Sequence, residues 1–156
     1  MSANPQQISL LSMTLENKLS EQGRIYALKQ CEEADEKTLL GISSIAFKHP
    51  LIGLLLQIFL GVFGVGRFYK GKGVDIALGI AFIIGVCVVC AMLGYGLFSE
   101  SEVIPIVSCV LVVIYTIAVY VDSYFVYRGI QSDNLLRLQE YLFFSKHNDK
   151  IRTRNE

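Results

Sequence analysis

The sequence has no tryptophan, only three prolines, and little charge across its middle half. Its 14 basic and 14 acidic residues give a formal net charge of zero, whereas nucleic-acid binding usually calls for a basic excess. Residues 51–127 contain seven charged side chains: Arg67, Lys70, Lys72, Asp75, Glu100, Glu102 and Asp122. A stretch this apolar and this poor in charge is not typical of a disordered chain. The composition therefore disfavours a nucleic-acid binder and a disordered linker.

Cysteine and histidine are scarce as well. The four cysteines and two histidines show no spacing typical of a zinc site or a disulfide framework. Cys87 and Cys90 form a Cys-x-x-Cys pair inside an apolar run, where thiols usually act as small packing residues. The sequence therefore predicts no metal and no cofactor. A membrane thiol oxidoreductase is the least favoured of the functions considered.

Three apolar segments are predicted at about residues 49–66, 74–98 and 103–127. Crossing a hydrocarbon core of about 30 Å takes about 20 helical residues, so the second and third segments are long enough. The first is either a short span or a re-entrant helix. A chain of 156 residues could not cover such helices with a polar shell, which disfavours a soluble enzyme. We expect an all-α fold, an integral membrane helical bundle with two to three apolar helices and short amphipathic helices in the tails.

This pattern predicts a polar N-terminal tail (1–47), a transmembrane domain (48–130) and a C-terminal tail (131–156). Lysine and arginine near membrane ends favour the cytoplasmic side. We therefore expect the basic loop 67–73 and the C-terminal tail on the cytoplasmic side of a cell (inner) membrane. Three spans would put the N-terminal tail outside, whereas a re-entrant first segment would put it inside. Its sidedness is left open.

Two short helices are expected in the N-terminal tail. Ser20 and Asp35 have the side chains typical of helix N-caps, which predicts helices over residues 21–33 and 36–44. The first of these is expected to carry three residues on one side: Ile25, Leu28 and Cys31.

A further helix is expected in the C-terminal tail. Ser132 or Asp133 would begin it, and it would extend to residue 144. Its apolar face would consist of Leu135, Leu138 and Leu142. That face suits a helix lying on the membrane surface, and it suits equally a helix packed on the N-terminal tail.

Charged residues at the ends of the apolar segments carry the main structural prediction. Arg67 follows the first segment and Asp122 lies near the end of the third. Because an unpaired charge in the membrane is costly, we predict an ion pair that joins these two segments. Three further basic residues flank the apolar segments and are expected to contact lipid headgroups: Lys70, Lys72 and Arg128.

One stretch of the sequence carries a family likeness. It reads Phe59-Leu60-Gly61-Val62-Phe63-Gly64-Val65-Gly66-Arg67-Phe68-Tyr69-Lys70-Gly71, and it resembles the signature of the two-transmembrane ("TM-two") domain family. Phe47-Lys48-His49-Pro50 is similar to the lead-in of bacterial members, and Asp122-Ser123-Tyr124-Phe125 to the family's second helix end. The resemblance implies membrane embedding and motif or structural roles for Gly61, Gly64, Arg67, Phe68, Tyr69, Gly71 and Asp122. It departs at Gly66, where the family has aspartate.

The resulting expectation is a non-enzymatic multi-pass membrane protein, a scaffold or interaction module of undefined biochemical activity. Its expected partners are the lipid bilayer and either a second copy of the chain or other membrane proteins. The alternative is a subunit of an oligomeric membrane transporter or pore. That function would need polar side chains along a path through the bilayer, and the candidates are Gln57, Ser108, Thr116 and Asp122.

Overall fold

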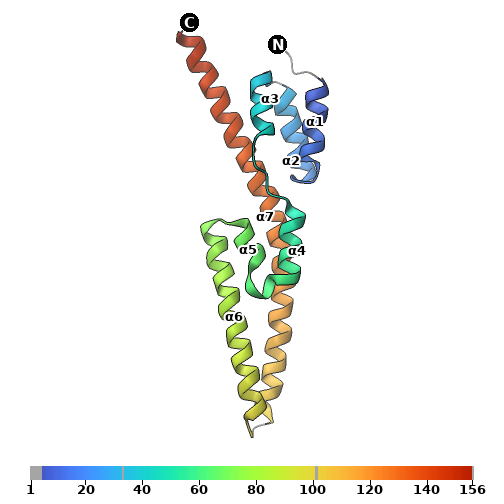
Figure 1. The fold of residues 1–156 in the computed structure, drawn as a ribbon, viewed down its shortest axis with the longest axis vertical. Helices are drawn as coiled ribbons and strands as arrows, with labels where there is room; N and C mark the ends of the chain where they lie inside the picture. Colours follow the sequence, from blue (N-terminus) through green and yellow to red (C-terminus); the bar gives the residue numbers. More distant parts are fainter. Residues whose placement is uncertain (1–4, 33, 101, 156) are drawn as a thin grey trace. The chain divides into compact units, whose positions relative to one another are not determined.

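The computed structural model describes residues 5–32, 34–100 and 102–155, and within these ranges the chain is helical with no strand (Figure 1). The elements are α1 (Pro5–Glu16), α2 (Glu21–Glu32), α3 (Glu36–Ser43), α4 (Pro50–Leu60), the 3-10 helix η1 (Gly61–Phe63), α5 (Val65–Lys70), α6 (Gly73–Phe98) and α7 (Val103–Asn155). The predicted all-α fold class is confirmed. The chain forms two compact units, which we call the tail unit (residues 1–50 and 128–156) and the hairpin unit (residues 51–127).

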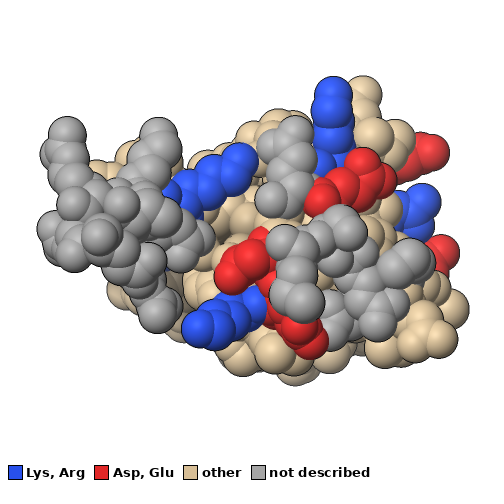
Figure 2. All heavy atoms as spheres, turned by 90° about the horizontal axis from the view of Figure 1, so that it is seen from above, with Lys and Arg blue, Asp and Glu red and all other residues tan. Residues whose placement is uncertain are grey.

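The tail unit is built around a leucine-rich core. Leucines spaced four apart on and just after α1 bury their side chains against α2, α3 and the C-terminal part of α7, because that spacing places them on one helix face. The core residues are Leu11, Leu15, Leu19, Ala27, Cys31, Leu39, Ile42, Leu138 and Leu142. Of the two alternatives for the apolar face of the C-terminal tail, the structure shows packing on the N-terminal helices. Charged side chains of both signs are interspersed over the face seen in Figure 2.

Both predicted N-caps are present in the tail unit. The Asp35 carboxylate accepts from the backbone N–H of Thr38 at 3.1 Å, and this hydrogen bonding lowers the pKa of Asp35 below its ordinary value. The Ser20 hydroxyl accepts from the N–H of Gly23 at 3.2 Å.

Two expectations for the tails need correction, and one helix was not expected. The C-terminal helix does not begin at Ser132 or Asp133, because α7 continues through both without a break. Ile25 does not share a buried face with Cys31: its side chain is 61% exposed, and the buried face of α2 consists of Gly23, Ala27 and Cys31. Helix α1 was not predicted.

Asn134 ties two connecting segments of the tail unit to α7. Its amide nitrogen donates to the carbonyl oxygens of Lys18 at 2.8 Å and Lys48 at 2.7 Å, and its amide oxygen accepts from the N–H of Lys48 at 3.1 Å. The side chain is buried, so these bonds satisfy backbone groups that lie outside any helix. Asn134 therefore fixes the chain on either side of α2 and α3.

The hairpin unit consists of two long helices and a shorter helical turn. Helices α6 and α7 are joined by residues 99–102, and η1 and α5 pack against α6 (Figure 1). The first apolar segment, predicted as one helix over about 49–66, is instead broken after Leu60. The 11 residues of α4 rise only about 16 Å, which is about half of a hydrocarbon core.

A left-handed glycine reverses the chain after α4. Gly64 has φ +66°, a conformation that glycine adopts without strain. A Cβ at this position would lie 2.6 Å from both the Cα and the carbonyl oxygen of Gly79 on α6. The turn therefore touches α6 backbone to backbone, and both glycines are needed for that contact.

Helices α6 and α7 are long and apolar enough to cross a membrane. Only 6% and 11% of the residues in their most apolar 18-residue windows are buried. The core helices of a soluble protein would be mostly covered, whereas these expose isoleucine, valine and leucine around most of their circumference.

We expect Gly64→Ala to destabilise the hairpin unit strongly, by about 2 kcal/mol or more, because it combines a left-handed backbone with a clash against Gly79. Gly73→Ala is the matched control, since a Cβ there would meet nothing within 4 Å. Thermal unfolding in detergent micelles measures the difference. Equal midpoints for the two variants would contradict the backbone contact.

Candidate functional site

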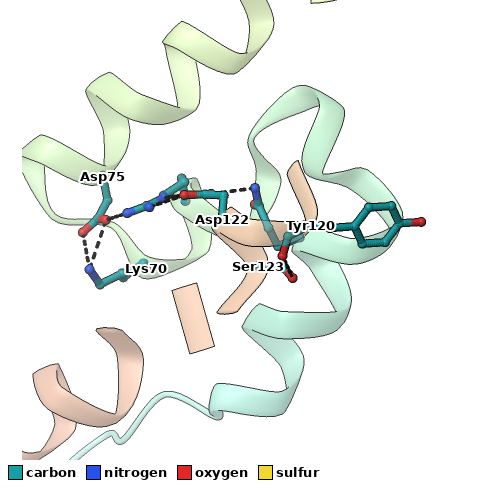
Figure 3. Close-up of polar contacts among 7 residues, drawn as sticks. Lys70, Asp75, Tyr120, Asp122 and Ser123 are labelled. Carbon is teal, nitrogen blue, oxygen red and sulfur yellow. Dashed lines mark hydrogen bonds and ion pairs between the residues drawn. The ribbon is translucent and has the colours of Figure 1, made fainter. Parts of the chain in front are cut away.

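A cluster of charged side chains lies inside the hairpin unit. Figure 3 shows Lys70, Asp75 and Asp122 within it, each from a different helix. Arg67 from α5 completes the set of ions, and Gln57 from α4 adds an amide. The cluster therefore takes one or more side chains from each of the four α-helices in this unit.

Arg67 is the centre of the cluster. Its Nε donates to the two Asp122 carboxylate oxygens at 3.1 and 3.0 Å, and its Nη2 donates to Oδ1 of the same carboxylate. Its Nη1 donates to Asp75 Oδ1 at 2.7 Å. One planar guanidinium thus joins the two carboxylates, which is the fork geometry that arginine offers and lysine does not. The predicted Arg67–Asp122 pair is present.

Two further side chains donate hydrogen bonds to the carboxylates of the cluster. Lys70 Nζ lies 3.0 Å from Asp75 Oδ2, and Gln57 Nε2 donates to Asp122 Oδ2 at 2.9 Å. The two cations and two anions sum to zero charge. The side chains of the four ions are between 4% and 14% exposed. A buried cluster with no net charge avoids most of the cost of an isolated ion.

Local backbone structure brings these side chains together. Asp75 lies in the first turn of α6, where the helix dipole favours a carboxylate. Gly66 lets α5 approach α4, because a Cβ there would lie 2.5 Å from Gln57 Oε1 and 3.0 Å from the Gly53 carbonyl oxygen. Gly61 plays the same part toward α7, where Val119 Cγ1 would be 2.7 Å away. The glycines of the motif thus permit close packing around the ions.

A second set of polar contacts, outside the ion cluster, holds the turn formed by η1. The Tyr115 hydroxyl on α7 donates to the carbonyl oxygens of Val62 at 2.8 Å and Phe82 at 2.7 Å. Its single hydrogen is shared between the two acceptors. Tyr115 therefore links η1, α6 and α7 and supports the Val62 carbonyl, which the 3-10 geometry leaves outside a regular α-helical ladder.

The other residues of the predicted motif take structural positions. Phe68 lays its ring against Gly79, where a Cβ would lie 2.9 Å from the ring carbons, and Gly71 ends α5 with φ 77°. Tyr69 is half-buried. Lys72 and Arg128 are exposed, whereas Lys70, predicted with them as a headgroup contact, is engaged with Asp75.

Sequence reasoning missed two members of the cluster. Asp75 was visible as one of seven charges in the apolar middle, and Gln57 as a lone amide in the first apolar segment. Both signals concern polar side chains that an apolar environment would leave unpaired. One Gln57 atom, Oε1, is buried and has no hydrogen-bond partner among the residues that the structure describes.

The described residues contain no group of three or more histidine, cysteine, aspartate or glutamate side chains that could hold a metal ion. Cys87 and Cys90 are exposed on α6, and their role as small packing residues stays a prediction.

Comparisons with family models, with curated proteins and with solved structures find no match to this chain. The likeness to the two-transmembrane domain family therefore stays a prediction. The geometry of the cluster stands independently of it.

We expect Arg67→Gln to lower the free energy of unfolding by about 3–5 kcal/mol, because it leaves the Asp122 carboxylate buried without a cation. The double variant Arg67→Gln/Asp122→Asn should recover much of this loss, since the Lys70–Asp75 pair that remains is neutral. Unfolding in micelles measures both.

Lys72→Gln is the control for removing one positive charge, because Lys72 is exposed and is expected to change stability by less than about 0.5 kcal/mol. A double variant no more stable than Arg67→Gln alone would show that the cluster is not held by charge pairing.

Proposed function

We propose that this chain is a multi-pass membrane protein with two spans, α6 and α7, and that it serves as a non-enzymatic scaffold or interaction module. The observation that carries the proposal is the apolar surface of these helices, which the rest of the chain leaves uncovered. In water that surface would drive aggregation, whereas in a bilayer an apolar surface is the one that contacts the lipid tails. The buried ion cluster supports the same proposal, because it leaves the hairpin unit without bare internal charge.

The helical turn α4–η1–α5 is proposed as a re-entrant element. The Tyr115 hydroxyl donates to the carbonyl oxygens of Val62, in the turn, and of Phe82, on α6, so these two residues lie at the same level. From Phe82 to the end of α6 the helix continues for about 24 Å, which follows from 1.5 Å per residue. The chain then returns through α5 to Gly71, beside the start of α6. The turn therefore enters and leaves on the same side.

A re-entrant element makes the number of crossings even, so both tails lie on one side of the membrane. The basic loop 67–73 lies on that side too, and residues 99–102 on the other. The excess of lysine and arginine near the membrane ends favours the cytoplasmic side of a cell (inner) membrane. The tail unit, with its own core and mixed surface charge, is then the part that meets soluble or membrane-bound partners.

The alternative is a transporter or pore subunit, and the polar side chains considered for it do not support that function. Gln57 and Asp122 hydrogen-bond to each other within the cluster at 2.9 Å. Ser108 donates to the carbonyl oxygens of Met92 and Ile104, and Thr116 to that of Val112. Each is engaged within its own chain, which is the arrangement expected of structural rather than path-lining groups.

Cysteine labelling of intact cells tests the topology. Cys87, Cys90 and Cys109 are replaced by alanine, and Cys31 is kept, because burial raises the pKa of its thiol to about 11 and leaves little reactive thiolate. Single variants Gln22→Cys, Lys72→Cys and Glu100→Cys are then treated with a membrane-impermeant maleimide. We expect labelling at position 100 in intact cells, and at positions 22 and 72 only after permeabilisation.

Labelling of Gln22→Cys together with Glu100→Cys in intact cells would mean that the first segment crosses fully, and the re-entrant proposal would fail. Release of the protein from membranes by alkaline carbonate would contradict membrane insertion itself. The four-alanine variant that also lacks Cys31 reports any labelling that comes from this residue.

A further inference from the structure

We draw no further inference here: the strongest candidate, the apolar pocket between α1 and α3 of the tail unit that is lined by Leu10, Leu11, Thr14, Leu39, Leu40 and Ser43, is an unpartnered apolar surface, and nothing in the structure shows what covers it.

Discussion

The pairing of Arg67 with Asp75 and Asp122 is the interaction on which the hairpin unit depends. A charge surrounded by apolar side chains is tolerated only where opposite charges and hydrogen bonds replace the water it has lost. Because Arg67 lies on α5 and its partners on α6 and α7, satisfying this one guanidinium fixes three helices at once. Lysine could balance the charge, but it could not hold two carboxylates in one plane.

The same constraint explains why glycine surrounds the cluster. The ions can meet only if the turn after α4 comes very close to α6 and α7. Gly64 meets Gly79 backbone to backbone, and Gly61 lies where a Cβ would press on Val119. The close contact then excludes water from the ions, which strengthens their attraction. Small residues and charged residues therefore act together here: neither would be stable in this place without the other.

The sequence predicted the parts of this structure that depend on local chemistry or on a single strong cost. Apolar length located α6 and most of α7, cap residues located α2 and α3, and the cost of a lone carboxylate paired Arg67 with Asp122. It did not predict the break at Leu60, which depends on a left-handed Gly64 that only the neighbouring helix makes necessary. Asp75 was missed because pairing by three-dimensional proximity leaves no periodic signal.

Helix α7 contributes to both units, and its exposed side chains differ between them. In the hairpin unit most of its exposed side chains are apolar, among them Val113, Ile117 and Phe125, and its buried ones include Asp122 and Ser123. In the tail unit Leu138 and Leu142 are buried and Arg137 and Glu140 are exposed, although Asn134 is buried there as well. A helix that is apolar outside and polar inside is stable in lipid, and the opposite pattern is stable in water. The charge-poor stretch ends between Tyr127 and Arg128, so the proposed membrane insertion places the change of surrounding solvent at this level of α7.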